Sequence, residues 1–111
     1  MYCRMVWGHL KPGGWEDYER YYHEKVFPLN DKVDGLLDRS ILRGIDGEDE
    51  AVSLSTWDSM ASLKWYENSN LRKQFADDIQ TNYATSWSYI TGEYWVRTFQ
   101  VVNVTRYEEA I

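Results

Sequence analysis

The order of apolar runs along the chain is the feature that most limits how it can fold. Residues 2–10 are almost continuously apolar, which is typical of a central strand buried on both faces. A helical pattern follows over about 15–26, and Pro28 is expected to break or kink it. Two further strands are predicted over 36–44 and 51–57, joined by a short acidic turn.

The second half of the chain repeats this alternation of helix and strand. Asp58 or Ser59 is expected to cap a helix that is interrupted at 68–70 and then begins again. An apolar stripe with a spacing of four indicates that this helix packs on a sheet: Leu71, Phe75 and Ile79. Residues 84–92 are interpreted as an unusually apolar loop, and the last strand is predicted over 93–104.

The resulting order is strand, helix, strand, strand, helix, strand. Two long crossovers and one hairpin predict an α+β fold with a ferredoxin-like βαββαβ antiparallel sheet. Right-handed crossovers place both helices on one face of that sheet. The first strand is nevertheless apolar on both sides, with Cys3, Met5 and Trp7 on one side and Tyr2 and Val6 on the other. We therefore expect a homodimer in which a second copy covers the open face.

Length and charge narrow the functional classes. The chain has 111 residues, and we expect one domain over 1–111. Its formal charge is −6 and its pI about 4.8, so nucleic acid is not an expected partner. The one cysteine, Cys3, lies in an apolar run and is interpreted as a small buried side chain. No secretion signal or apolar run long enough to cross a membrane is apparent, so no membrane partner and a cytoplasmic location are expected.

Three segments carry a resemblance to a known family. They are the strand that ends in Leu10-Lys11-Pro12-Gly13, the strand Gly35-Leu36-Leu37-Asp38-Arg39-Ser40-Ile41-Leu42-Arg43, and the segment Leu54-Ser55-Thr56-Trp57-Asp58-Ser59. With these, residues 2–104 resemble the antibiotic-biosynthesis monooxygenase-like (ABM-like) proteins of the dimeric α+β barrel superfamily. The motifs are signatures of the fold more than of an active site.

The resemblance implies a cofactor-independent monooxygenase acting on a small aromatic or quinol-like molecule. An electron-rich phenolate or carbanion reduces oxygen without help, so the protein has to bind it, deprotonate it and exclude water. The alternative is a non-catalytic member that binds a small ligand or has a regulatory role. An isomerase of the same superfamily is a third possibility, because a fold alone does not choose a reaction.

The resemblance also implies a residue test for haem breakdown. The haem-degrading branch uses an Asn on the first strand and a Trp and a His on the second helix. The first strand of this chain has no Asn, and the stretch from Leu71 to Asn82 has no His. Trp65 or Tyr66 matches the aromatic position only, so haem breakdown is not favoured.

Two residues are candidates for catalysis. His9 lies near the end of the first strand, where an imidazole could act as a general base, and His9→Ala should then abolish turnover. Its alternative role is a histidine at the rim with one satisfied nitrogen. Tyr66 is the second candidate, because a phenolic hydroxyl that faces a cleft can bind a ligand carbonyl. Alternatively, Tyr66 belongs to an aromatic stripe of its helix and is a core residue.

Five residues are predicted to bind the substrate, and each has a structural alternative. Tyr22 and Trp65 lie on covering helices and can instead be core residues, whereas His23 can be a surface residue. Arg39 and Arg97 lie on strands, where they could hold an enolate or carboxylate. Alternatively these arginines pair with a carboxylate such as Asp38 or Glu93. The histidines and acids show no metal-ligand spacing, so neither a metal nor a cofactor is predicted.

Overall fold

The computed structural model describes residues 1–47, 49–84 and 95–105. It contains four strands and a set of helical segments. The strands are β1 (Tyr2–His9), β2 (Leu36–Arg43), β3 (Glu50–Trp57) and β4 (Trp95–Gln100); the α-helices are α1 (Trp15–Tyr21), α2 (Met60–Glu67) and α3 (Asn70–Asn82). This is the α+β, ferredoxin-like βαββαβ arrangement that the sequence predicts.

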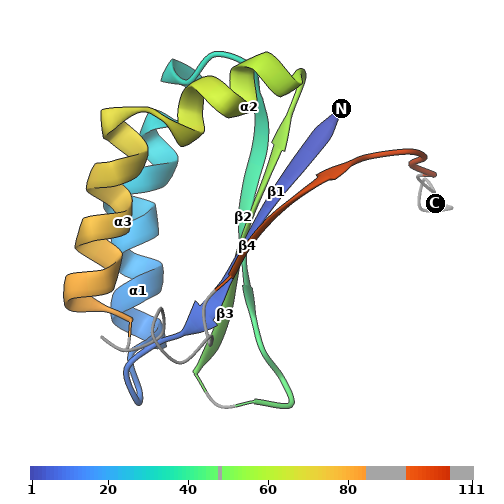
Figure 1. The fold of residues 1–111 in the computed structure, drawn as a ribbon. Helices are drawn as coiled ribbons and strands as arrows, with labels where there is room; N and C mark the ends of the chain where they lie inside the picture. Colours follow the sequence, from blue (N-terminus) through green and yellow to red (C-terminus); the bar gives the residue numbers. More distant parts are fainter. Residues whose placement is uncertain (48, 85–94, 106–111) are drawn as a thin grey trace, which may run out of the picture.

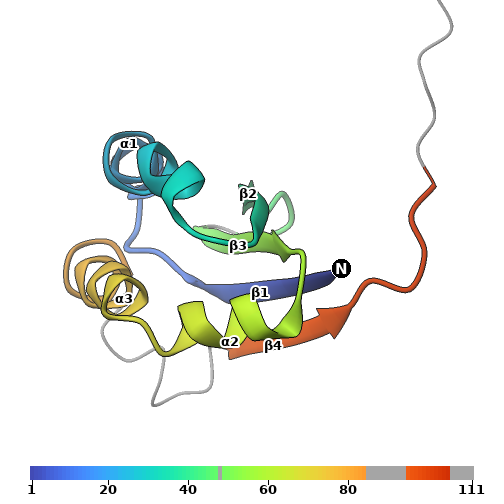
Figure 2. The ribbon, with the colours of Figure 1, turned by 90° about the horizontal axis from the view of Figure 1, so that it is seen from above.

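The strands form one antiparallel sheet in the order β2-β3-β1-β4. The apolar first strand is therefore a central strand, as its composition indicates. Figures 1 and 2 show α1 and α3 side by side on one face of the sheet, with α2 near its end, whereas no helix of the described residues lies on the other face. Every residue of β1 is only half-buried, because a single chain covers one of its two faces.

The first helix changes its winding at Tyr22. The α-helix α1 passes into a π-helical turn, η1 (Tyr22–Val26), and then into a 3₁₀ segment, η2 (Phe27–Lys32), where Pro28 occupies the first turn. The predicted helical extent over 15–26 is confirmed, whereas the π-helical winding of its second half was not predicted. π-Turns inside helices are rare and are frequent at functional sites.

Gly35 ends this helical region. It has φ +82°, and a Cβ atom at this position would collide with the side chains of Ser62 and Asp58. Glycine alone tolerates both the positive φ and the close approach, so the chain turns sharply into β2 here.

The two later helices begin at serine caps. The Ser59 hydroxyl accepts a hydrogen bond from the Ser62 amide at 3.1 Å, and the Ser69 hydroxyl accepts one from the Arg72 amide at 3.2 Å. Each cap satisfies an amide that the first helical turn leaves without a partner. The predicted interruption and fresh start near 68–70 is therefore confirmed.

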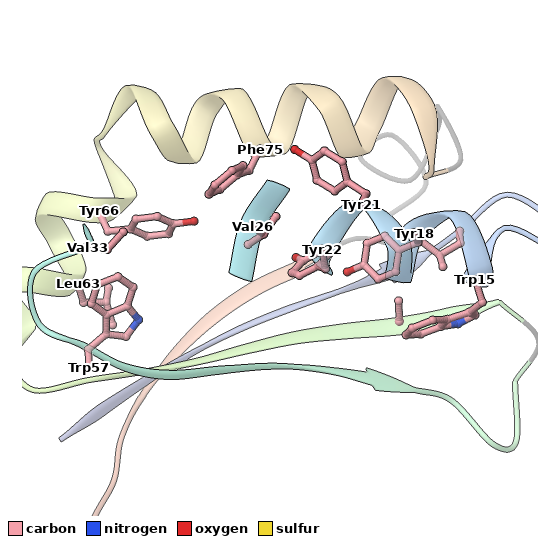
Figure 3. Packing of buried hydrophobic residues seen from close by; sticks show 12 residues of the cluster. Trp15, Tyr18, Tyr21, Tyr22, Val26, Val33, Trp57, Leu63, Tyr66 and Phe75 are labelled. Atoms are coloured by element: carbon pink, nitrogen blue, oxygen red, sulfur yellow. The ribbon is translucent and has the colours of Figure 1, made fainter. Parts of the chain in front are cut away.

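The core lies between the sheet and the helical layer. Its most deeply buried side chains are Trp57, Leu63 and Val26, at no more than 1% exposure. Figure 3 shows aromatic rings filling the layer between α3 and the sheet. The Trp57 indole donates a hydrogen bond to the Ser55 hydroxyl at 2.9 Å, which satisfies the buried N–H.

The last strand is shorter than the sequence predicts. It spans Trp95–Gln100, and residues 101–105 continue without strand structure, so the expectation of a strand to residue 104 is wrong. The predicted loop over 84–92 falls, except for Ala84, outside the described residues. Within the described part of the chain, no helix is long and apolar enough to cross a membrane.

Candidate functional site

A cavity opens between the sheet and the helical layer, and we call it the Tyr66 pocket. Its enclosed volume is about 80 Å³, and about 690 Å³ when the open solvent at its mouth is included. Its lining contains strand residues, helix residues and the ends of two elements: Arg4, Val6, Gly8, His9, Leu10, Tyr18, Tyr22, Arg39, Ala51, Ser53, Tyr66, Arg72, Phe75, Ala76, Ile79 and Ala84. The enclosed volume lies below the usual range for small-molecule sites, about 300–1,000 Å³.

Small residues on the sheet form the floor of the pocket. Gly8 pairs with Ala51, and Val6 pairs with Ser53, in the antiparallel ladder of β1 and β3. Because these side chains are short, they leave a space between the sheet and the helices that cover it. The alternation of serines with larger apolar residues in β3 predicts a wetter or more tightly packed face, and the pocket lies on that face.

Aromatic rings form the walls. Tyr22 at the start of the π-turn packs on Tyr18, with ring centroids 4.9 Å apart. Phe75 of α3 also lines the pocket. The Tyr66 ring lies 5.0 Å from the Trp57 ring, which fixes it against the core. In Figure 3 the Tyr66 hydroxyl points away from α2 into the space beneath Phe75. The walls therefore present flat apolar surfaces with one hydroxyl directed inward.

Two arginines stand in one row across the sheet. Arg39 of β2 and Arg4 of β1 are both direct neighbours of Ser55 in β3. Residues in one such row point to the same face, and both arginines line the pocket. Strands lie roughly 5 Å apart, so the two backbones are separated by roughly 10 Å and their long side chains can converge.

The two guanidinium groups meet at Tyr66. Arg39 Nη1 donates a hydrogen bond to the Tyr66 hydroxyl at 3.3 Å, and the Arg39 Cζ lies 5.3 Å from the centre of that ring. The Arg4 Cζ lies 5.9 Å from the same ring centre. The Nε atoms of Arg4 and Arg39 are buried and have no hydrogen-bond partner among the described residues.

A third arginine enters from the helical layer. Arg72 of α3 lines the pocket, and its Nε donates to the Glu67 carbonyl oxygen at 2.7 Å. The described lining contains no aspartate or glutamate, and none of the three arginines forms an ion pair with a described residue. The pocket is therefore locally cationic within an acidic chain.

The structure brings together three of the predicted site residues and leaves a fourth at the edge. Tyr22, Arg39 and Tyr66 line the pocket. His9 also borders it, but its ring lies 5.0 Å from the Trp7 ring, which stacks on Trp95. Trp7 and His9 point to the sheet face without helices, so the imidazole is directed away from the pocket interior.

The other three predicted site residues do not line this pocket. His23 is exposed, and its Nε2 lies 3.8 Å from a carboxylate oxygen of Glu19 on the same helical surface. Trp65 is 62% exposed on the outer side of α2. Arg97 lies on β4 and packs over the Trp95 ring at 5.3 Å, on the open sheet face.

Sequence reasoning missed Arg4, Arg72 and Phe75 as pocket residues. Arg4 carried a signal, because it is the one charge inside the apolar first strand. Its alternation with Cys3 and Met5 places it on the face that the helices cover. Of the two carboxylates expected to pair with a strand arginine, Asp38 forms no ion pair with Arg39. The other, Glu93, lies outside the described residues.

Among the described residues, two groups outside the pocket lining have shifted pKa values. Burial, together with a hydrogen bond to the Asp78 carboxylate at 2.9 Å, raises the pKa of Tyr21. Burial and the nearby Asp38 charge raise the pKa of the Cys3 thiol, which disfavours the reactive thiolate. In the described part of the chain, no three His, Cys, Asp or Glu residues are grouped as a metal site.

Comparison with known families decides the affiliation. The sequence pattern described as antibiotic biosynthesis monooxygenase (ABM) matches residues 1–78, which include the first three strands, the first helical region, α2 and the first part of α3. This chain belongs to the ABM family. The resemblance of its strand and turn motifs to ABM-like proteins is thereby confirmed. Among curated proteins, none matches this ABM sequence significantly.

Solved structures share the fold of this ABM protein at low sequence identity. A candidate antibiotic biosynthesis monooxygenase from Deinococcus radiodurans has a TM-score of 0.73 and 8% identity, covering 98% of this chain and all of its own. A Nitrosomonas europaea protein of unknown function gives 0.71 and 12%, with 97% and 95% covered. The haem-degrader MhuD of Mycobacterium tuberculosis, solved with two haems bound, gives 0.73 and 16%, with 96% and 100% covered.

Proposed function

We propose that this ABM protein is a cofactor-independent monooxygenase that oxidises a small aromatic or quinol-like molecule in the Tyr66 pocket. The observation that carries the proposal is the Arg39–Tyr66 hydrogen bond inside an aromatic-walled cavity. Membership of the ABM family supports the reaction class.

The Arg39–Tyr66 pair gives the pocket a directed hydrogen-bond donor. The Tyr66 oxygen accepts from Arg39, so its own proton remains available to an oxygen atom of the substrate. The flat walls, including Tyr22 and Phe75, would hold the substrate ring by apolar contact. This arrangement would orient the ring and stabilise negative charge that develops on its oxygen.

The substrate itself can supply all the electrons for the reaction. An activated CH₂ group beside an aromatic ketone loses one proton to solvent at the pocket mouth, and the resulting carbanion transfers one electron to O₂. The two radicals combine into a C–O–O⁻ group that takes up a proton. Cleavage of the O–O bond with loss of the second C–H proton yields C=O and water. One oxygen atom enters the product, and the other leaves as water.

The proposal assigns the polar role to Tyr66 and Arg39. It does not use His9 as the base, because the imidazole packs on Trp7 at the other sheet face. Under this assignment His9→Ala keeps most of its activity, contrary to the expectation from the sequence. The chemistry then depends on stabilising the substrate anion more than on a dedicated base inside the pocket.

An oxygen electrode tests the proposal, with anthrone as the probe and EDTA in the buffer. We expect the protein to accelerate O₂ uptake with one anthraquinone formed per O₂ and no hydrogen peroxide released. Tyr66→Phe should lower the rate at least tenfold through the lost donor. Trp65→Phe is the matched control, because this neighbouring ring is 62% exposed outside the pocket. Uptake equal to that of buffer, or equal rates for both variants, would refute the proposed roles.

A non-catalytic binding role is the second candidate. The described pocket lining contains no carboxylate, and the one histidine at its border directs its ring elsewhere. A pocket without a base favours binding over turnover. Saturable binding of anthrone under air with no O₂ uptake would establish this role, and turnover without O₂ uptake would indicate an isomerase.

We propose further that two copies pair through the open sheet face. That face carries Met5, Trp7 and Leu54 in the sheet centre, and Phe99, which is 45% exposed. The self-pairing of apolar sheets explains why β1 is apolar on both sides. Native mass spectrometry of the freshly purified protein should show a dimer, and a monomer at micromolar concentration would contradict this arrangement.

A further inference from the structure

The arginines of the Tyr66 pocket have no counter-charge in the described structure. Arg4, Arg39 and Arg72 line one cavity whose described lining has no carboxylate. The chain as a whole has a net charge of −6, so carboxylates are abundant elsewhere on it. Arg20, by contrast, lies within 3.5 Å of carboxylate oxygens of Glu16 and Asp17 on the surface of α1.

The row Arg39–Ser55–Arg4 brings like charges together at a partly buried place. Both guanidinium carbons lie within 6 Å of the Tyr66 ring centre. Like charges repel more strongly in such surroundings than in water, and a buried donor without an acceptor carries a further free-energy penalty. Both penalties disappear when an anion enters the pocket.

The donor pattern indicates the kind of anion. Arg4 and Arg39 each present a buried Nε–H without a described acceptor, and they approach from strands on either side of β3. A carboxylate has two oxygen atoms in one plane, so it can accept from both arginines at once. Arginine matches carboxylate geometry better than a single oxygen atom does.

We infer that the Tyr66 pocket binds a planar aromatic carboxylate, with its acid group between Arg4 and Arg39 and its ring against Tyr66 and Phe75. This inference takes the aromatic nature of the ligand from the proposed function and adds the acid group, which makes the ligand an anion. Arg72 supplies a third positive charge from α3. The site thus selects a negative ligand despite the negative charge of the whole protein.

Isothermal titration calorimetry at pH 7 tests the inference, with 2-naphthoate and the neutral 2-naphthamide as probes. The two probes share the same ring and nearly the same shape, so they differ mainly in charge. The variants are Arg4→Gln and Arg39→Gln. Arg43→Gln is the matched control, because Arg43 lies on the same strand as Arg39 but is exposed and outside the pocket lining.

We expect wild type to bind the acid roughly 10- to 100-fold more tightly than the amide, as is typical of a charge-assisted hydrogen bond. The preference should disappear in Arg4→Gln and Arg39→Gln and persist in Arg43→Gln. Equal wild-type affinities for acid and amide, no binding of either probe, or a preference that survives in both pocket variants would overturn the inference. The wild-type comparison decides the matter even where a variant does not fold.

Thermal stability separates a binding role from a structural one. Arg4→Met keeps the length of the side chain and removes the charge. Its melting temperature should equal or exceed that of wild type, while its preference for the acid is lost. A large drop in melting temperature with the preference retained would show that Arg4 serves the fold and not the ligand.

Further measurements identify the source of the carboxylate and separate this inference from the proposed function. Haem also presents carboxylates on a planar ring, so haem and its dimethyl ester form a second pair of probes, followed by visible absorbance. Tighter binding of naphthoate than of haem indicates a small acid, whereas tighter binding of haem, again in preference to its ester, indicates a larger one. Acid preference without O₂ uptake would refute the oxygenase alone, whereas O₂ uptake without acid preference would refute the carboxylate alone.

Discussion

The hydrogen bond between Trp57 and Ser55 links the stability of the core to the candidate site. Trp57 is 0% exposed and Ser55 4% exposed, and the indole donates to the hydroxyl at 2.9 Å. The Trp57 ring also supports Tyr66, and Ser55 stands between Arg4 and Arg39 in the sheet. The variant Ser55→Ala removes the acceptor and leaves the buried indole N–H unpaired.

The cost of this change follows from the burial of both partners. A buried donor without an acceptor costs about 1–3 kcal/mol. Removing the buried serine hydroxyl also removes the free-energy cost of burying it, which offsets part of this penalty. We therefore expect Ser55→Ala to lower the free energy of unfolding by about 1–2 kcal/mol. For a chain of this length, each kcal/mol corresponds to roughly 4 °C, so the melting temperature should fall by roughly 4–8 °C.

Thermal denaturation followed by circular dichroism at one fixed protein concentration measures the effect. Ser53→Ala is the matched control, because Ser53 lies on the same strand and face but its side chain makes no hydrogen bond to a described residue. The control should change the free energy of unfolding by less than about 0.5 kcal/mol. Equal melting temperatures for the two variants would refute the reasoning.

Three further predictions follow from the same geometry. Because burial and the Asp78 hydrogen bond raise the pKa of Tyr21, the stability from this group is complete below pH ~10 and is lost as the pH rises further. Chemical denaturation across this range should therefore show a smaller alkaline loss of stability for Tyr21→Phe than for wild type. Leu54→Asp at the centre of the open sheet face should turn the proposed dimer into a folded monomer in native mass spectra, and a surviving dimer would place the interface elsewhere. Trp65→Ala should change the affinity for 2-naphthoate less than twofold in calorimetry, since Trp65 lies outside the pocket. A larger loss of affinity would show that Trp65 contacts the ligand.

The fold was predictable because several local signals agree. The apolar run of β1, the acidic turn between β2 and β3, and the serine caps of α2 and α3 each specify one element without help from the rest of the chain. Their order leaves few topologies once right-handed crossovers are assumed. The π-turn at Tyr22 was not predictable, because the spacing of its apolar residues also fits an ordinary helix.

The site was predictable only in part, since a pocket depends on elements distant in the sequence. Tyr22, Arg39 and Tyr66 were identified by residue type and by their place on covering helices or inner strands. His9 shows the limit of that approach, because its position at a strand end was correct but strand alternation directs its ring to the other face. Arg4 was overlooked within an apolar strand, although alternation alone places it on the helix-covered face.

The binding geometry of the Tyr66 pocket is the central claim, and a crystal structure of the protein with 2-naphthoate tests it most directly. We predict that the carboxylate lies between Arg4 and Arg39, within hydrogen-bond distance of both Nε atoms, and that the ring contacts Tyr66 and Phe75. Ligand bound on the open sheet face, or in the pocket with its carboxylate directed away from both arginines, would contradict the account.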